Sequence, residues 1–314
     1  MRNWIRVLKV KLIQSIENGK GREMVFGDNF PDYDMKIDVT INKYMSALKD
    51  NATITIANLT YAQVIQIVNG KYYGVEIIAG YRDGNQTCVF KGAVLRISNT
   101  LNDDRTNDII ILCGSNLMAR FSQRFLNFSL QSGMNTYSAI KFLSARAGIK
   151  NSNISTQFKK DFLQQVATET KTIGSYLDSL ATNNPNIVIS ADETTGATFS
   201  IFDASKSNNR VINLRDVQYT GGYPRLDSTG LSFSILPTFA FQCGDVVMID
   251  NSLISLEAVS SIGEMETQSG YYLDKQGAYM ITSITYRLAN RGSQFGCNIT
   301  AKARSLISNY IGVV

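Results

Sequence analysis

Paired carboxylates are the feature of this sequence whose residue types and spacing could support catalysis. Three groups of acidic residues lie close together in the chain: Asp103-Asp104, Asp192-Glu193, and Glu264 with Glu266. Two carboxyl groups are enough for glycoside hydrolysis, one as acid and the other as base or nucleophile. All three groups fall in predicted turns or polar loops, where solvated charge is the ordinary interpretation. We therefore assign no catalytic residue and predict that the protein is not an enzyme.

Histidine is absent from the 314 residues of the sequence. Histidine is the usual general base at neutral pH and a common metal ligand. Its absence excludes Ser-His-Asp and Cys-His triads, and with them many hydrolytic mechanisms.

The four cysteines stand singly in the chain, at Cys88, Cys113, Cys243 and Cys297. No CxxC pair occurs, so the spacing supports neither a zinc site nor a disulfide framework. Most of these cysteines lie in strand-like segments, which favours buried free thiols in a protein made in a reducing cytoplasm.

Motifs for other metals and for phosphate are also missing. The acidic cluster at residues 102–104 lacks the alternate spacing and the following glycine of a calcium-binding loop. The glycines at Gly221-Gly222, and at Gly19 and Gly21, lack the residues that complete a phosphate-binding loop. The sequence therefore predicts no cofactor and no metal site.

Composition favours a soluble globular protein of two or three domains, since 44% of the residues are hydrophobic and 18% are charged. The N-terminus lacks an apolar signal segment, and polar residues interrupt the longest uncharged stretch, residues 51–70. We therefore expect no signal peptide and no membrane span.

The formal charge of +5 is modest, and the basic groups at residues 6–11 and at Lys159-Lys160 are short. This argues against specific nucleic-acid binding.

Apolar residues at alternate positions predict strands through the first third of the chain. The clearest alternations are Leu8, Val10 and Leu12, followed by Ile37, Val39 and Ile41. Further strands are expected at residues 53–56, 73–81, 88–98 and 108–113, with a short helix around Val64, Ile65 and Val68 that ends at Gly70. Strands at short intervals with turns between them predict a barrel or a sandwich.

The middle of the chain changes to helical periodicity. Asn135 or Thr136 can cap a helix, and Thr172 can cap a second one. The apolar face of the first helix is Ile140, Leu143 and Ala147, with Gly148 beyond its end. The apolar face of the second is Ile173, Leu177 and Leu180. A hairpin of residues 187–190 and 199–202 follows, which completes a small α+β unit.

Strands return in the last third. They are expected at the alternating Leu231, Phe233 and Ile235, at residues 246–250 after Gly244-Asp245, and in a hairpin of residues 279–286 and 295–303. The predicted fold class is therefore mainly β with an α+β insertion. Two tube-like β-barrel domains, residues 1–115 and 206–314, are expected to flank a small α+β domain at residues 116–205. No sequence repeat is visible, so a duplicated barrel is inferred from the architecture.

Three segments taken in order resemble the baseplate central hub proteins of contractile-tailed bacteriophages, also called the tail protein D family. The first is ATITIANLT at residues 52–60 with VFKGAV at 89–94. The second is the helix and hairpin block at 136–148 and 173–202. The third is GDVVMI at 244–249 with GAYMITSITY at 277–286, Arg291-Gly292 and 295–301. The hub part of type VI secretion spike proteins belongs to the same group. Where that family often has Trp in the last hairpin, this chain has Phe295.

The resemblance implies a structural protein of the virion, in the tail baseplate, assembled in the host cytoplasm. Three chains would form a homotrimeric ring with pseudo-sixfold symmetry that adapts a hexameric tail tube to a trimeric central spike. The implied partners are the central spike protein, the tail tube or tube-initiator protein, and baseplate wedge proteins. The polar segments at residues 19–35 and 251–270 are candidates for arms that reach a neighbour, or they are plain surface loops.

Other functions stay open. A distal tail or tube-initiator protein of a non-contractile tail would form a hexamer rather than a trimer. A cell-wall-degrading enzyme would depend on one of the carboxylate pairs. A carbohydrate-binding module is a weaker alternative, because a single tryptophan leaves few platforms for stacking sugars.

Overall fold

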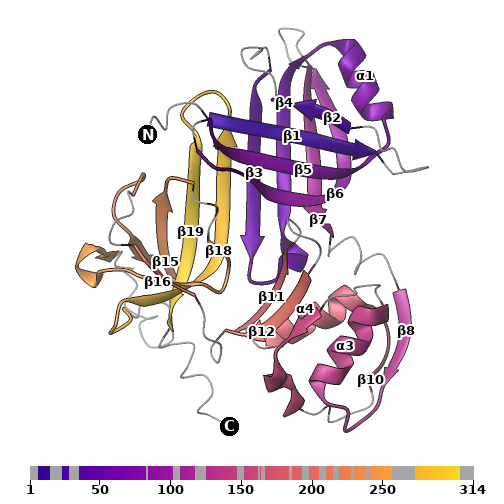
Figure 1. The fold of residues 1–314 in the computed structure, drawn as a ribbon, viewed down its shortest axis with the longest axis vertical. Helices are drawn as coiled ribbons and strands as arrows, with labels where there is room; N and C mark the ends of the chain where they lie inside the picture. The colour runs from indigo at the N-terminus through magenta and orange to yellow at the C-terminus, as the bar shows by residue number, and fades with distance from the viewer. Residues whose placement is uncertain are drawn as a thin grey trace, which may run out of the picture.

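The computed structural model describes most of the chain. The described residues are 6–14, 23–27, 35–82, 84–101, 107–116, 125–146, 152–161, 163, 167–183, 186–192, 198–204, 210–214, 219–227, 230–237, 239, 241–256 and 273–304. Within these residues the protein is mainly β with few helices, as the sequence predicts (Figure 1). None of the described helices is long and apolar enough to cross a membrane.

One sheet of fourteen strands carries both the first and the last third of the chain. The first third supplies β1 (Arg6–Gln14), β2 (Glu23–Phe26), β3 (Ile37–Tyr44), β4 (Asn51–Leu59), β5 (Tyr72–Tyr81), β6 (Gln86–Leu101) and β7 (Asn107–Ser115). The last third supplies β13 (Val211–Asn213), β14 (Arg225–Asp227), β15 (Gly230–Ile235), β16 (Val246–Met248), β17 (Ser255–Leu256), β18 (Ala278–Ala289) and β19 (Phe295–Ala303).

The order of the strands shows how the two thirds join. It runs β17-β14-β15-β19-β18-β3-β4-β7-β6-β5-β1-β2, with β16 pairing β18 and β13 pairing β16. The join is the antiparallel pairing of β18 with β3, in register from Ser283 opposite Tyr44 to Ala289 opposite Asp38. Figure 1 shows the yellow C-terminal strands standing beside the indigo β3. The predicted strands of both thirds are therefore confirmed, and they belong to one hydrogen-bonded ladder.

The predicted alternations place their apolar residues in one continuous core. The buried set includes Leu8, Val10, Leu12, Ile37, Val39, Ile41, Leu231, Phe233 and Ile235. Residues of both thirds contribute to this core, because the sheet brings them to one side. Burying apolar area is the main favourable contribution to folding, at about 25 cal/mol for each Å².

The middle of the chain forms a separate unit with its own core. Its elements are β8 (Phe125–Leu130), α3 (Thr136–Arg146), β9 (Ser152–Ile154), the 3₁₀ turn η2 (Thr156–Lys159), β10 (Ala167–Thr172), α4 (Ile173–Asn183), β11 (Ile187–Asp192) and β12 (Thr198–Asp203). Its strands form two small sheets, β8 with β10, and β11-β12-β9. Ile140, Leu143, Ile173 and Leu177 are buried in its core, as the helical spacing predicts. This unit lies below the main sheet in Figure 1. The domain boundaries given above stay a prediction.

The helix caps agree with the sequence. The Asn135 side chain accepts a hydrogen bond from the Ser138 N–H at 2.8 Å, and Thr172 accepts one from the Ser175 N–H at 3.1 Å. Asn135, rather than Thr136, therefore caps α3. Ala147 and Gly148, expected at its end, lie outside the described residues.

Two local features differ from the sequence-based expectation. Residues 23–26, predicted as part of a polar loop, form β2 against β1, because Met24 and Phe26 alternate with polar or exposed neighbours and Phe26 reaches the core. The expected helix is α1 (Tyr61–Asn69), but it buries Val64 and Ile67 and leaves Ile65 and Val68 exposed. Of the polar segment 251–270, only the part up to residue 256 is described, as the 3₁₀ turn η3 (Asn251–Leu253) and β17.

The inserted unit touches the main sheet closely at Gly244, in the turn before β16. Gly244 has a φ of +92°, and a Cβ atom there would lie 3.1 Å from Val188 Cγ2 and 3.5 Å from the Phe202 ring. Val188 and Phe202 belong to the β11–β12 hairpin, which packs with Met280 of β18. The glycine thus permits both an unusual backbone conformation and a close approach of two units.

We predict that Gly244→Ala destabilises the protein by about 1–2 kcal/mol more than Gly222→Ala. Both glycines have similar positive φ values, but a Cβ at Gly222 would meet no atom within 4 Å. Each variant therefore loses the backbone contribution of about 1 kcal/mol, and only Gly244→Ala also crowds Val188. Urea unfolding of the two variants measures the difference. Equal losses would show that the contact with Val188 has no energetic weight.

Candidate functional site

Of the carboxylate groups considered in the sequence, only Asp192 lies within the described residues. Asp103, Asp104, Glu193, Glu264 and Glu266 lie outside the described residues. Asp192 is the last residue of β11 and pairs with Thr198 of β12. Within the described ranges, no three His, Cys, Asp or Glu side chains come together in a way that could hold a metal ion.

The four cysteines are free thiols, as their isolated positions in the sequence favour. Cys113 and Cys297 are buried, while Cys88 and Cys243 are half-buried. Burial raises the pKa of Cys113 and of Cys297 to about 12, and that of Cys88 to about 11. Because the thiolate is the reactive form, these thiols are poor nucleophiles at neutral pH.

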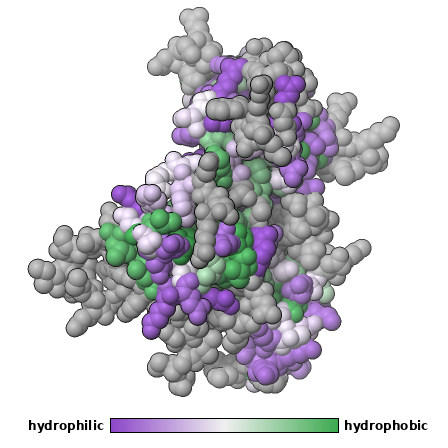
Figure 2. All heavy atoms as spheres, turned by 60° about the vertical axis from the view of Figure 1, so that its left-hand side comes forward, coloured by the Kyte–Doolittle hydropathy of each residue, from purple (hydrophilic) through white to green (hydrophobic). Residues whose placement is uncertain are grey.

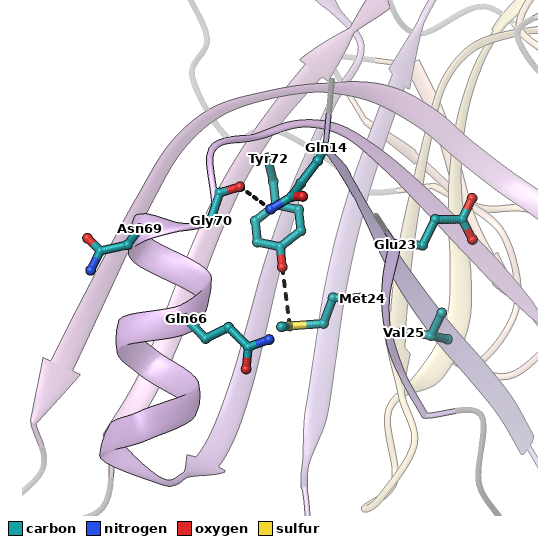
Figure 3. Close-up of a pocket in the computed structure, with 8 residues that line it drawn as sticks. All are labelled: Gln14, Glu23, Met24, Val25, Gln66, Asn69, Gly70 and Tyr72. Atoms are coloured by element: carbon teal, nitrogen blue, oxygen red, sulfur yellow. Dashed lines mark hydrogen bonds between the residues drawn. The ribbon is translucent and has the colours of Figure 1, made fainter. Parts of the chain in front are cut away.

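A cavity of about 640 Å³ lies between α1 and β2. Figure 3 shows its lining, in which the Gln14 amide donates to the Gly70 carbonyl oxygen at 2.5 Å and the Tyr72 hydroxyl points to the Met24 sulfur at 3.8 Å. Glu23 is the acidic residue of this lining, and its side chain is exposed. Hydrolysis by paired carboxylates requires a second acid, so this cavity offers no such centre among its described lining residues.

The joint between the main sheet and the inserted unit forms around the short connection from β3 to β4. This connection contains the 3₁₀ turn η1 (Ala47–Lys49), whose Ala47 and Leu48 side chains lie in the core of the inserted unit. The Ile189 N–H donates to the Met45 carbonyl at 2.7 Å, and the Ser115 hydroxyl donates to the Ala47 carbonyl at 2.7 Å. The connection is therefore held by both units.

A second cavity, of about 460 Å³, opens at this joint. We call it the joint cavity. It is lined by Lys43, Tyr44, Ala47, Asp50, Thr87, Cys88, Val89, Phe90, Lys91, Ser115, Val188, Ile189, Ser190, Ser200, Phe239, Phe241, Gln242 and Cys243. These residues come from the first third, the inserted unit and the last third, so the cavity exists only when all three are in place.

Asp50 is an acidic group of the joint cavity whose pKa departs from its ordinary value. Its carboxylate accepts a hydrogen bond from the Tyr44 N–H at 2.8 Å. Burial raises the pKa of Asp50 to about 7, and the Tyr44 N–H and the nearby Lys43 ammonium offset this only in part. Nothing in the sequence indicates this role, because a lone Asp between two strands is typical of a turn.

The described sheet also leaves strand edges without a partner. β17 and β2 end the strand order, and β13 pairs only with β16. Beyond Ala93, β6 pairs with β7 but not with β5. Exposed apolar side chains accompany these edges: Leu95 (51% exposed) and Leu101 (66%) on β6, and Leu256 (61%) on β17. Figure 2 shows hydrophobic residues at the surface on the side that carries the C-terminal strands. Edges of this kind are templates for pairing with another chain.

Comparison with known proteins gives a likeness in fold. At the level of sequence, neither a protein-family model nor a curated protein matches this chain. Among solved structures, it is similar to a tail protein of prophage MuSo2 from Shewanella oneidensis, with a TM-score of 0.57 and 11% identity over 96% of this chain and 98% of that one. A tail protein from Neisseria meningitidis matches with a TM-score of 0.54 and 10% identity over 97% of this chain and 98% of that one.

A third similar structure comes from a secretion system. It is an E. coli protein described as a component of the type VI secretion system with structural similarity to tail proteins of bacteriophage T4. The TM-score is 0.52 and the identity 9%, over 85% of this chain and 73% of that one. The expected resemblance in fold is thereby confirmed over nearly the whole chain.

We predict that Asp50 makes the protein less stable as the pH rises from 6 to 8. Its pKa in the folded protein, about 7, lies above the ordinary value of 3.8. Folding therefore favours the protonated carboxyl, whose contribution is complete below about pH 4 and is lost as the pH rises through about 7. Asp50→Asn should remove this loss and be more stable than the native protein at pH 8, by on the order of 1 kcal/mol.

Thermal unfolding at several pH values measures this effect. Asp38→Asn is the matched control, because it removes a carboxylate that forms a partly exposed ion pair with Lys36 on the same strand region. If Asp50→Asn and Asp38→Asn change the pH profile equally, the burial of Asp50 is not its cause.

Proposed function

We propose that this protein is a structural component of a bacteriophage tail, and that it forms the trimeric central hub of a baseplate. The observation that carries the proposal is the fold: this chain matches a prophage tail protein, and a second protein named as a tail protein, over almost their full lengths. The unpartnered strand edges give the physical means of assembly, since pairing with a neighbouring chain satisfies their backbone groups.

The division of the sheet supports a ring of three chains. The first and the last third each contribute seven of its strands. We infer that residues 1–115 and 206–314 act as two tube-like barrels, flanking the inserted domain at 116–205. Three chains would then present six similar units around one axis, matching a hexameric tail tube on one side and a trimeric spike on the other.

The proposed partners are the central spike protein, the tail tube or tube-initiator protein, and baseplate wedge proteins. The similarity to a type VI secretion component supports a place near a spike-like assembly. The proposed location is the tail baseplate of the virion, assembled in the host cytoplasm. A ring held by interfaces needs no catalytic group, which fits a chain without histidine.

A distal tail or tube-initiator protein of a non-contractile tail is the second candidate function. The same unpartnered edges would also serve a hexameric ring, so the number of chains separates the two. A wall-degrading enzyme would instead require a carboxylate pair, and loss of peptidoglycan hydrolysis on changing Asp192 and Glu193 would be its signature.

We predict that the purified chain, alone or mixed with the spike protein of the same genome, has the native mass of a trimer or of a three-to-three complex. Native mass spectrometry measures this. A hexamer would favour the tube-initiator function. A monomer that does not bind the spike would contradict the hub proposal.

Edge substitutions test how the ring closes. We expect Leu95→Lys on β6 and Leu256→Lys on β17 to lower the mass to that of a monomer without lowering the melting temperature, because each places a charge beside an unpartnered edge. Phe142→Lys is the control, since Phe142 is an exposed apolar residue on α3, away from these edges. An unchanged mass for both edge variants would show that these edges lie outside the interfaces.

A further inference from the structure

Lys43 is a lysine of the joint cavity that forms no ion pair with any residue that the structure describes. Lys43 places its Nζ atom 5.9 Å from the centroid of the Tyr286 ring. Among the ion pairs formed by described residues, none includes Lys43. Asp50 influences it only through space. A cation held over an aromatic face in a half-enclosed cavity is placed to receive an anion.

The walls of the joint cavity suit the apolar part of an organic ligand. Phe239 packs against Tyr286 with ring centroids 5.6 Å apart, and Phe241 and Val188 are further apolar members of the lining. Hydroxyl and amide groups also line the cavity, on Thr87, Ser115, Ser190, Ser200 and Gln242. Its volume of about 460 Å³ lies within the range of small-ligand sites.

We propose that the joint cavity binds an organic carboxylate that carries an apolar group. The carboxylate would contact the Lys43 ammonium, and the apolar group would lie against Phe239, Phe241 and Val188. The lining holds two lysines, Lys43 and Lys91. An ammonium over an aromatic ring, in a cavity with aromatic walls, favours this class over inorganic phosphate, which proteins usually hold with several cationic groups or backbone N–H donors. The proposal does not depend on the role in the tail.

The other charged and titratable groups around Lys43 set the expected pH dependence. They are Tyr44 at the end of β3, Asp50 on the β3–β4 connection, Cys88 and Lys91 on β6, Cys243 and Asp245 before β16, Tyr286 on β18 and Cys297 on β19. Asp245 is paired with Arg210. Burial raises the pKa of each of the three thiols above its ordinary value, which leaves the thiols uncharged at neutral pH. Asp50 is therefore the group whose charge changes near neutrality, and its protonation leaves Lys43 uncompensated.

The test uses N-acetylphenylalanine and its neutral amide as probes with the full chain, by isothermal titration calorimetry at pH 6 and pH 8. We expect the acid to bind, the amide to bind at least about tenfold more weakly, and the acid to bind more tightly at pH 6. Lys43→Met keeps the length of the side chain and should lose the preference for the acid. Lys91→Met, which removes the other lysine of the lining, should keep it.

A second pair of probes separates the sources of the carboxylate. The blocked peptide acetyl-Gly-Phe-Glu-Gly-amide and its Gln counterpart present the acid as a side chain of a polypeptide. Binding of the Glu peptide alone would identify a segment of a partner protein as the ligand, and binding of N-acetylphenylalanine alone would identify a small organic acid.

Two results would overturn the proposal. One is equal or absent binding of all charged and neutral probes. The other is a preference for acids that survives in Lys43→Met while near-ultraviolet circular dichroism shows an intact fold. Asp50→Asn gives an independent check, because it should bind the acid with the same affinity at both pH values.

Discussion

The antiparallel pairing of β18 with β3 is the interaction on which the rest of the structure depends. It joins strands from opposite ends of the sequence, and every other strand of the large sheet is linked to one of these two, either directly or through the strands between them. Without it, the apolar faces of the first and last thirds would form two smaller cores, each with another exposed edge. With it, they share one core whose buried side chains run from Leu8 to Ala303.

The inserted unit depends on the same pairing in a less direct way. Its hairpin packs against Met280 of β18, and its core receives Ala47 and Leu48 from the connection that follows β3. Both strands of the pair therefore help to fix the inserted unit, β18 through Met280 and β3 through the connection that follows it. The ion pair between Lys49 and Asp178 adds to this contact, but its partly exposed groups contribute little compared with the buried side chains.

Periodicity in the sequence predicted the helices and strands well, because the spacing of apolar residues in a segment reflects which of its faces is buried. The alternation of Leu231, Phe233 and Ile235 follows directly from a strand with one buried face. The pairing of one strand with another leaves no such pattern in the sequence of either strand. Nothing near Ser283 or Tyr44 indicates that they lie opposite each other, and β2 is too short to stand out from the polar residues around it.

The candidate site was less predictable for the same reason. Lys43 and Asp50 are ordinary residues at the end of one strand and before the next, and they become unusual only when the β11–β12 hairpin and the turn at Gly244 close over them. Composition alone excludes histidine chemistry, because the sequence contains no histidine. A site that three distant segments build together has no motif by which to find it.

The pairing of β18 with β3 also determines when this protein can finish folding during its synthesis. The ribosome releases β3 early, and its partner strand emerges only after most of the chain has been translated. Until then the edge of β3 that pairs with β18 is open to other nascent chains, along with its apolar residues Ile37, Val39 and Ile41. Since contacts between residues far apart in sequence also form slowly, the yield of native protein should be limited by this last step of translation.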